Sequence, residues 1–238
     1  MQQYFAVSEK SNTFYLNNND LNHIKNVMRM KSGDNIIVAY NNESYICSLN
    51  NDLLSCEKKE LFKKEDNYSE FIVYVPLLSE EKMSFILQHG TELGVTKFIV
   101  VQYEHCKYKL KSKDFEHKLQ RWNRIIKEAS EQSYRIHIPT LDSIIEPKDI
   151  KGKTNVNILC SLDKANVKSI CQVLTTYNCN DTISLVFGPE GGLSIKEEDM
   201  IESNHFTKVS LGNDVLRTET VPLMIASIRR YLKESVQK

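Results

Sequence analysis

The hydrophobic pattern of the chain changes character near residue 70. Before that point, short apolar runs are separated by turn residues, and "NIIVAY" and "SYICSL" flank Asn41 and Asn42 like the strands of a hairpin. The stretch "DLNHIKNVMRM" has helical spacing instead and is expected to place on one face Leu21, Ile24, Val27 and Met28. We therefore expect a small β-rich domain over residues 1–70, with the charged segment 58–70 as its exit.

From residue 71 onward, continuously apolar runs alternate with stretches of helical spacing. The expected strands are "FIVYVPLL", "KFIVVQY", "NVNILCSL", "TISLVFG" and "FTKVSLG". The longest helical pattern, "DFEHKLQRWNRIIKEASEQS", has a common face formed by Leu119, Trp122, Ile126 and Ala129. Strands that are apolar throughout and alternate with helices indicate an α/β domain over residues 71–238, with a mainly parallel sheet covered on both faces.

Composition narrows the class of protein. Lys+Arg and Asp+Glu both number 31, so the strong basic excess of many nucleic-acid-binding proteins is absent, although a local basic patch is compatible with this total. The six cysteines form no C-x-x-C pair and no zinc-ligand spacing, so we expect no metal. The N-terminus has no signal-peptide pattern, and no apolar run approaches the ~20 residues of a membrane span. These features predict a reduced, cytoplasmic protein without a membrane partner.

The loop after the expected strand "TISLVF" carries the first functional signal. Gly188 ends this strand, and ligands of open parallel sheets bind beyond the carboxyl ends of the strands. Gly191 and Gly192 are expected to permit positive φ and a close approach of the backbone to a ligand. Ser194 and Glu197 have the spacing of a capping box at the start of a helix.

This loop does not have the features of a phosphate-binding loop. It contains neither G-x-G-x-x-G nor G-K-[ST]. Glu197, Glu198 and Asp199 in the first helical turn would repel an added anion, and we expect only Lys196 to oppose them. The loop therefore favours an adenosine-like ligand with a positive charge and no phosphate, which describes S-adenosylmethionine. A plain strand-to-helix turn is the alternative.

A second glycine-ended strand, "FTKVSLG", leads into the polar segment "NDVLRTET" before the last helix. Arg217 in this segment has the fork geometry that pairs with a phosphate or a carboxylate. Because both loops follow strands of one parallel sheet, we expect them to form one shared site. Helix capping by Thr218 or Thr220 is the alternative for this segment.

The two loops together resemble a known signature. "FGPEGGLS" followed by "SLGNDVLRTET" is similar to the C-terminal motifs of the bacterial 16S ribosomal RNA uridine-N3 methyltransferases, which belong to the SPOUT superfamily. "HIKNVMRMKSGD", "TELGV" and "RW…EASEQSYRIHIP" stand upstream in the order that this family shows. The resemblance covers nearly the whole chain and depends on several separate motifs.

The resemblance implies both a fold and a reaction. The fold is a C-terminal SPOUT methyltransferase domain with a deep trefoil knot, which sequence rules alone would not propose, after a small PUA-like β-barrel domain that binds RNA. The reaction transfers a methyl group from S-adenosylmethionine to N3 of a uridine of 16S rRNA in the small (30S) ribosomal subunit, at uridine 1498 in the conventional rRNA numbering. The family also forms homodimers with the site at the interface.

The resemblance further implies which residues bind the methyl donor. They lie in the two loops and at the end of the "NILCSL" strand, and are Leu162, Phe187, Gly188, Pro189, Glu190, Gly191, Gly192, Leu193, Leu211, Gly212, Asn213, Val215, Leu216, Arg217 and Thr218.

Catalysis must help uracil N3 to lose its proton, because N3 becomes nucleophilic only then. Arg217 is the candidate for stabilising the charge on a uracil oxygen or for binding a phosphate, and Glu219 and Glu92 are candidate proton acceptors. A helix-cap acid is the alternative for Glu219, and a solvated surface residue is the alternative for Glu92.

RNA affinity should come from contacts between basic residues and phosphates. The segment "HCKYKLKSKDFEHK" would present on one face, if extended, Lys107, Lys109, Lys111 and Lys113. The full set of residues expected to contact RNA is Arg29, Lys31, Lys107, Lys109, Arg121, Arg124 and Arg135. A solvated, lysine-protected loop is the alternative for the lysine segment.

Three positions depart from the family pattern, which usually has lysine at His89, arginine at His105 and glycine at Tyr134. The two histidines weaken any phosphate binding there at neutral pH.

Two other functions compete with the leading one: a SPOUT methyltransferase for another RNA base or a ribose, and a non-catalytic ribosome assembly factor. The N-terminal similarity disfavours the first, and the intact "GPEGG" and "LRTET" motifs disfavour the second.

Overall fold

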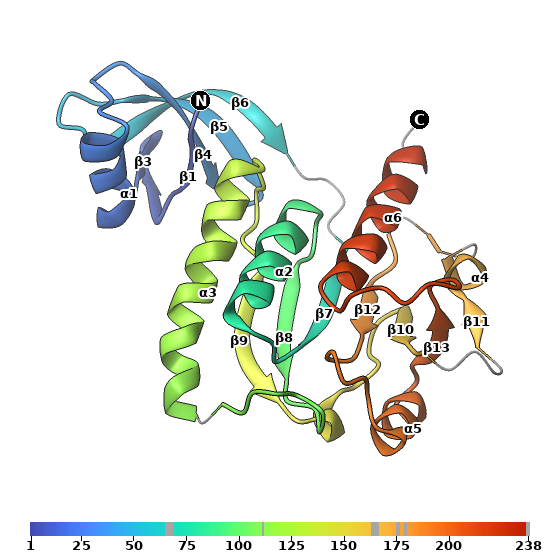
Figure 1. The fold of residues 1–238 in the computed structure, drawn as a ribbon. Coiled ribbons are helices and arrows are strands. Elements are labelled where there is room, and N and C mark those ends of the chain that lie inside the picture. The colour runs from blue at the N-terminus through green and yellow to red at the C-terminus, as the bar shows by residue number, and fades with distance from the viewer. Residues whose placement is uncertain (65–68, 111, 163–166, 175–176, 179, 237–238) are drawn as a thin grey trace. The chain divides into compact units, whose positions relative to one another are not determined.

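The computed structural model describes residues 1–64, 69–110, 112–162, 167–174, 177–178 and 180–236. It consists of two compact units (Figure 1). The N-terminal unit comprises Met1–Asn67 together with Glu128–Ile138, and the larger unit comprises Tyr68–Lys127 together with Pro139–Lys238. A segment from the middle of the chain therefore belongs to the N-terminal unit.

The N-terminal unit is built on a six-stranded sheet in the order β1-β4-β5-β6-β3-β2. Its strands are β1 (Gln3–Phe5), β2 (Ser8–Lys10), β3 (Thr13–Tyr15), β4 (Asn35–Tyr40), β5 (Glu43–Leu49) and β6 (Ser55–Lys64). The β4–β5 pair confirms the predicted hairpin. Asn41 and Asn42 form its turn with left-handed φ values of 48° and 65°, which a two-residue hairpin turn requires.

Strand β6 corrects the expected exit over residues 58–70. The chain stays in the sheet as far as Lys64, paired with β5 along its length. Most side chains in this strand are exposed and charged, so the strand lacks the alternation of apolar and polar residues that a half-buried strand shows. Pairing with β5 holds it in the sheet despite its composition.

The expected single helix over residues 20–30 is two different elements. Helix α1 (Asn18–Asn22) continues into a π-helical turn, η1 (His23–Val27). Ile24 is fully buried, but Val27 is 62% exposed and Met28 is 45% exposed. A π turn is wider than an α turn, so residues spaced for one α-helical face rotate apart. The prediction of a shared buried face is therefore wrong for Val27 and Met28.

The larger unit contains a seven-stranded sheet in the order β11-β13-β10-β12-β7-β8-β9, and each neighbouring pair is parallel. Its strands are β7 (Phe71–Pro76), β8 (Lys97–Val101), β9 (Thr140–Ile145), β10 (Val156–Cys160), β11 (Lys168–Ser169), β12 (Ile183–Val186) and β13 (Thr207–Ser210). This confirms the predicted α/β class with a mainly parallel sheet. The sequence pattern does not predict β9, because polar residues interrupt its short run "TLDSII".

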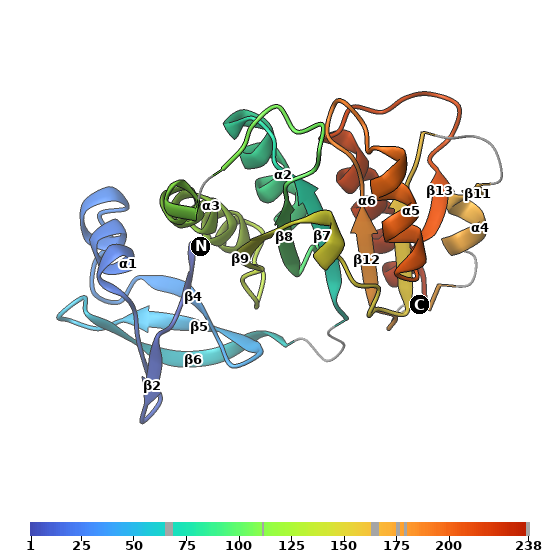
Figure 2. The same cartoon turned by 90° about the horizontal axis from the view of Figure 1, so that it is seen from below.

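The helices of the larger unit are α2 (Glu80–Glu92), α3 (Ser112–Gln132), α4 (Ile170–Leu174), α5 (Ile195–Ser203) and α6 (Thr220–Val236), with a 3-10 turn η2 (Pro147–Asp149). The residues of α3 from Glu128 onward belong to the N-terminal unit. Helix α2 packs against α6 and lies beside α3 (Figures 1 and 2). The predicted inner face of α3 is confirmed, since Trp122, Ile126 and Ala129 are buried. None of the described helices is long and apolar enough to cross a membrane.

Parallel pairing determines where a ligand site forms in the larger unit. The carboxyl ends of parallel strands meet at one edge of the sheet. The loops that follow β7, β8, β10, β12 and β13 therefore lie at one edge, which is at the bottom of the view in Figure 1, near α5. Strand order and register do not define how the chain threads, so the trefoil knot stays a prediction.

Trp122 offers a test of the core of the larger unit. It is the largest fully buried side chain, and its Nε1 donates to Oε1 of Glu80 at 3.1 Å. We expect Trp122→Ala to lower the free energy of unfolding by about 3–5 kcal/mol, because the truncation leaves a cavity. Urea denaturation followed by circular dichroism measures the change, since the variant lacks the one tryptophan of the chain.

The control for this experiment is Tyr108→Ala, at a side chain that is 48% exposed. It should change the free energy of unfolding by less than about 0.5 kcal/mol. Equal losses in the two variants would contradict the packing described for α3.

Candidate ligand-binding site at the carboxyl edge of the parallel sheet

Three loops surround a pocket of about 290 Å³ at the carboxyl edge of the sheet. They follow β10, β12 and β13, the strands from which the sequence predicts the site. The lining consists of Cys160, Ser161, Leu162, Phe187, Gly188, Pro189, Glu190, Gly191, Gly192, Leu193, Glu198, Ser210, Leu211, Gly212, Asn213, Asp214, Val215, Leu216, Thr218 and Val221. The structure thus brings together all residues predicted to bind the methyl donor except Arg217, and it adds Ser161, Glu198 and Asp214 among others.

The glycines of the loop between β12 and α5 are required for different reasons, either a close neighbour or a positive φ. A Cβ atom on Gly188 would lie 3.0 Å from the carbonyl carbon of Gly192, so the backbone passes too close for a side chain. Gly192 has a φ of +73°, and its N–H donates to the carbonyl of Pro189 at 2.9 Å. The expectation of positive φ is wrong for Gly191, whose added Cβ would instead meet Cβ of His105 at 2.9 Å.

The segment after β8 supports this loop. Nδ1 of His105 lies 3.2 Å from the carbonyl oxygen of Gly192. The N–H of Glu104 donates to Oε1 of the buried Glu197 at 2.8 Å. Oε2 of Glu197 accepts from both N and Oγ of Ser194, which confirms the predicted capping box. A single carboxylate therefore joins the start of α5 to the loop after β8.

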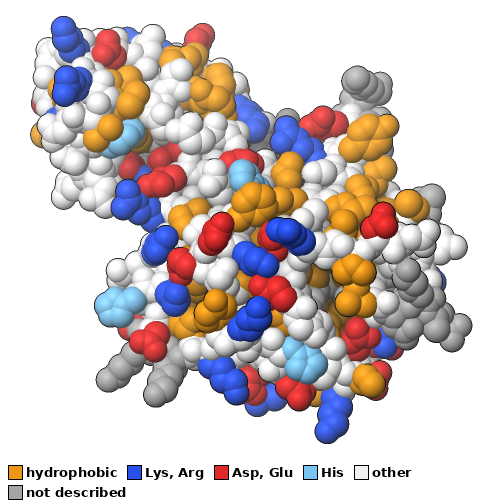
Figure 3. Space-filling model, in the orientation of Figure 1, with side chains coloured by type: hydrophobic (Ala, Val, Ile, Leu, Met, Phe, Trp, Pro, Cys, Tyr) orange, Lys and Arg blue, Asp and Glu red, His pale blue; other side chains and the backbone are white. Residues whose placement is uncertain are grey.

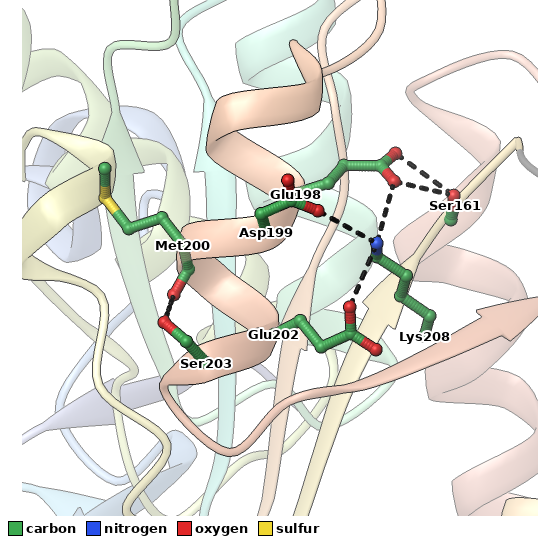
Figure 4. A network of polar contacts seen from close by, with 7 residues as sticks. All are labelled: Ser161, Glu198, Asp199, Met200, Glu202, Ser203 and Lys208. Carbon is green, nitrogen blue, oxygen red and sulfur yellow. Dashed lines mark hydrogen bonds and ion pairs between the residues drawn. The ribbon is translucent and has the colours of Figure 1, made fainter.

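The acids of α5 face a lysine that the sequence pattern does not identify. Nζ of Lys208, on β13, lies 3.6 Å from Glu198, 3.7 Å from Asp199 and 3.0 Å from Glu202 (Figure 4). The hydrogen bond with Glu202, and then the charges of all three acids, raise the pKa of Lys208. The expectation that only Lys196 opposes these acids is therefore wrong.

Glu198 connects this ionic cluster to the pocket. Oγ of Ser161 donates to its carboxylate, with both oxygens 3.0 Å away (Figure 4). Both residues line the pocket, whereas Lys208 does not. Lys208 and Ser161 therefore hold a carboxylate in the pocket wall.

Lys82, in the first turn of α2, joins two of the segments that form the site. Its Nζ lies 3.0 Å from Oε1 of Glu190, in the loop after β12, and 3.1 Å from Oε2 of Glu219, just before α6. The nearby carboxylates of Glu190 and Glu219 raise the pKa of Lys82. Burial alone would raise the pKa of each carboxyl group, but backbone hydrogen bonds and Lys82 outweigh it, so both pKa values are lowered.

The pocket is acidic on its inner surface. Glu190, Glu198 and Asp214 line it, and no Lys, Arg or His is found among its described lining residues. The lysines that pair with two of these acids, Lys82 and Lys208, lie behind the lining. This arrangement favours a ligand with a positive charge and disfavours a phosphate.

The segment between β13 and α6 forms both a pocket wall and the start of the last helix. Thr218 is buried and lines the pocket. The carbonyl of Arg217 accepts from the N–H groups of Thr220 and Val221 at 2.9 and 3.3 Å. The Arg217 side chain is exposed and lies outside the lining. The structure therefore places Arg217 beside the pocket rather than in its wall.

The two candidate proton acceptors are far apart. Glu219 is held by Lys82, at the start of α2, while Glu92 is the last residue of that helix, about 15 Å further along its axis. Oε2 of Glu92 lies 3.0 Å from Nδ1 of His89. Within one copy of the chain, the structure therefore does not bring Glu92 to the pocket. In the part of the chain that is described, no group of three or more His, Cys, Asp or Glu residues is arranged to hold a metal ion.

The residues predicted to contact RNA are divided between the two units. Arg29, Lys31 and Arg135 belong to the N-terminal unit, and the larger unit contains Lys107, Lys109, Arg121 and Arg124. The lysine segment is not extended throughout, because α3 begins at Ser112, and Lys111 lies outside the described residues. On the face shown in Figure 3, basic side chains of the larger unit are interspersed with acidic ones. One of the predicted RNA contacts, Arg121, is itself paired with an acid, since its Nε lies 3.4 Å from Oε1 of Glu80.

Tyr134 occupies a position that suits the glycine usual in the family. Its φ is 53°, in the left-handed region where a side chain strains the backbone. The ring packs against Phe62 at 5.8 Å between centroids, and the hydroxyl donates to the carbonyl of Met1 at 2.8 Å. The tyrosine therefore gains contacts within the N-terminal unit at the expense of backbone strain.

Known proteins share this architecture and these motifs. Family models match residues 64–230 as an RNA methyltransferase domain and residues 16–55 as an RNA methyltransferase PUA domain. Ribosomal RNA small subunit methyltransferase E of Bacillus subtilis (strain 168) is 31% identical, with 98% of each chain covered. The protein of the same name from Mesomycoplasma hyopneumoniae (strain 232) is 30% identical over 94% of this chain and 97% of the relative.

A solved structure of a relative with the same name has a similar fold. The crystal structure of ribosomal RNA small subunit methyltransferase E from Neisseria gonorrhoeae, bound to S-adenosyl methionine, has a TM-score of 0.81. It is 26% identical, and 98% of each chain is covered.

The contact between Gly191 and His105 can be tested by substitution. Gly191→Ala places a methyl group against Cβ of His105, so we expect the loop to shift and the free energy of unfolding to fall by about 1–3 kcal/mol. Amide hydrogen exchange at Gly192 should become faster, because its contacts with Pro189 and His105 loosen.

The double variant Gly191→Ala/His105→Gly removes the opposing Cβ atom. In the His105→Gly background, Gly191→Ala should lower the free energy of unfolding much less than it does in the wild type. A double-mutant cycle measures this difference. Strictly additive effects would show that the contact does not constrain the loop.

Proposed function

The chain belongs to the ribosomal RNA small subunit methyltransferase E family of RNA methyltransferases, and on that basis we propose that it methylates N3 of a uridine in 16S rRNA. The proposed donor is S-adenosylmethionine, and the proposed substrate is the assembled small ribosomal subunit. The observation that carries the proposal is the pocket with three carboxylates and no described cationic side chain in its lining. S-adenosylmethionine has a sulfonium cation and no phosphate, so its chemistry matches this lining.

The donor would be held by the three loops at the carboxyl edge of the sheet. The backbone at Gly192 leaves room for close contact with a ligand, since no atom lies within 4 Å of the position that a Cβ would take there. Glu190, Glu198 and Asp214 in the pocket wall would supply negative charge to a cationic donor. When bound, the donor supplies an electrophilic methyl group, and the protein's part is to orient it towards the acceptor base.

We assign the assistance of N3 deprotonation chiefly to Arg217. Arg217 is exposed and stands in the chain between Leu216 and Thr218, which both line the pocket, so its side chain is available to a base that enters beside the pocket. A guanidinium there would stabilise negative charge on a uracil oxygen as N3 loses its proton. Glu219 is a weaker base than a free glutamate, because its pKa is lowered in the ion pair with Lys82. Its role in the site is better explained by that pair than by proton transfer.

RNA and a second copy of the chain complete the proposed assembly. The basic residues of both units, such as Lys31 and Lys109, would contact phosphates, and the enzyme would meet its ribosomal substrate in the cytoplasm. Apolar side chains near the pocket, Leu162, Ile195 and Val215, are 68%, 80% and 74% exposed. A homodimer interface that covers them accounts for this exposure.

A methyl-transfer assay tests the proposal directly. Small ribosomal subunits that lack the modification are incubated with the protein and labelled S-adenosylmethionine, and the nucleosides are identified by mass spectrometry. We expect N3-methyluridine at one position on subunits and much less on naked rRNA. Another methylated nucleoside would place the chain with enzymes for a different RNA site. Donor binding without any transfer would favour an assembly factor.

The charge of the pocket leads to a second test. Glu198→Gln keeps a partner for Ser161 but removes the negative charge from the pocket wall. Its affinity for cationic S-adenosylmethionine should fall about threefold to tenfold, while its affinity for neutral S-adenosylhomocysteine should change little. Isothermal titration calorimetry with both ligands measures the two dissociation constants.

Glu202→Gln is the matched control for this measurement. Glu202 pairs with the same Lys208 at 3.0 Å but does not line the pocket. It should leave the preference for the cationic ligand unchanged. Equal losses for both ligands in Glu198→Gln would contradict an electrostatic role of the carboxylate.

A further inference from the structure

We propose that Lys82 is a positioning residue, which holds the two ligand loops together through simultaneous ion pairs with Glu190 and Glu219 and thereby sets the affinity for the methyl donor. The identity of the ligand rests on the proposed function, whereas the bridge follows from the geometry. Lys82 belongs to α2, Glu190 to the loop after β12, and Glu219 to the segment before α6. One ammonium group therefore connects three segments that are far apart in the sequence.

The bridge keeps two like charges close together. The carboxylate oxygens of Glu190 and Glu219 lie 3.0 and 3.1 Å from the same Nζ atom, so they cannot be more than about twice that distance apart. The side chains of Lys82, Glu190 and Glu219 are 29%, 30% and 15% exposed, so water screens them only in part. Without the ammonium group, the two carboxylates would repel each other and move their loops apart.

The loops that the bridge holds are those that define the pocket. Glu190 lines it directly, and Glu219 follows Thr218, which lines it from the other side. Arg217 lies in the same short segment, so its position also depends on where Glu219 is anchored. Separation of the two loops would therefore widen the pocket and displace the guanidinium proposed to act on the acceptor base.

Other charged groups near the bridge are not equivalent to Lys82. Lys107 attracts Glu190 and Arg217 attracts Glu219, both through space rather than as ion pairs among the described contacts. The thiol of Cys106 also faces this region, and its pKa is raised by burial, so it is neutral at physiological pH. The bridge itself consequently titrates through its two carboxyl groups and through Lys82.

The first experiment compares donor affinity among variants of Lys82. Isothermal titration calorimetry with S-adenosylmethionine should show about a tenfold weaker dissociation constant for Lys82→Met than for the wild type at about pH 7.5. Lys82→Arg should retain most of the affinity, because a guanidinium can pair with both carboxylates. Lys148→Met is the matched control, since Lys148 pairs with Glu146 on the surface at 2.7 Å, away from the pocket.

The pH dependence distinguishes the bridge from a general loss of packing. In the wild type both carboxyl pKa values are lowered, so the bridge is intact at and above the ordinary glutamate pKa of about 4.3 and is lost only as the pH falls through the lowered values. In Lys82→Met, burial and mutual repulsion raise the pKa of one carboxyl group. Lowering the pH from about 7.5 should then protonate this group before the carboxyl groups of the wild type, relieve the repulsion, and reduce the factor by which the variant's dissociation constant exceeds that of the wild type.

A second substitution should rescue the variant. Lys82→Met/Glu219→Gln removes one of the two repelling charges, so its donor affinity should return to within about threefold of the wild type. Single-turnover methylation at saturating donor adds a further distinction. A positioning role lowers donor affinity more than the maximal rate, whereas direct contact of Lys82 with the reacting base would lower the maximal rate most.

The proposal is overturned if Lys82→Met binds the donor like the wild type, or if neither a lower pH nor the second substitution relieves its defect. If the wild type itself does not bind S-adenosylmethionine, the proposed function is wrong, yet the bridge can still be tested without ligand. Amide hydrogen exchange in residues 189–193 and 216–220 should then be faster in Lys82→Met and restored in the double variant. Unchanged exchange would overturn the bridge as well.

Discussion

Parallel pairing of the strands is the constraint on which the site depends. Strand β10 pairs with β13 on one side and with β12 on the other, and β7 and β8 extend the same parallel sheet beyond β12. Their carboxyl ends must therefore lie at one edge, where the connecting loops come together. The pocket lies there between the loops after β10, β12 and β13. The connections after β7 and β8 supply the residues that brace it, namely Lys82, Glu104 and His105. Residues separated by 87 to 137 positions in the chain thus become neighbours.

The charges around the pocket are arranged in two layers. The inner layer is acidic, and two of its carboxylates are each paired with a lysine that lies outside the lining, Glu190 with Lys82 and Glu198 with Lys208. A lysine in the lining itself would repel a cationic ligand, whereas unpaired carboxylates at this density would repel one another. Because the lysines lie outside the lining, they reduce the repulsion between the carboxylates without repelling a cationic ligand in the pocket. The zero net charge of the chain is consistent with such local pairing.

The features that the sequence predicts correctly are those with a local signal. Apolar runs identify most strands of the larger sheet, glycines identify the ends of β12 and β13, and Ser194 with Glu197 identifies the cap of α5. Lys82 and Lys208 have no such signal, because each stands in an ordinary helix or strand pattern and its partners are distant in the chain. Strand β6 is missed for a related reason, since its charged residues are held by pairing with β5 rather than by burial. The glycine at position 191 correctly indicates that a side chain is excluded there. The sequence does not show the reason, which is the close approach of His105 and not a left-handed φ.

The position of Arg217 shows how the two halves of the proposed reaction are linked. Its neighbours Leu216 and Thr218 line the pocket, its carbonyl receives the first N–H groups of α6, and the next acid, Glu219, is anchored to Lys82. The backbone of Arg217 is therefore held in place, while its side chain is exposed and makes no hydrogen bond or ion pair among the described contacts. A ligand in the pocket would contact Leu216 and Thr218, on either side of Arg217, and Lys82 connects the loop after β12 to the same segment through its ion pairs with Glu190 and Glu219. Under the proposed function, the loop that binds the donor and the segment that carries Arg217 are thus connected, so a substitution that loosens the first should also displace Arg217.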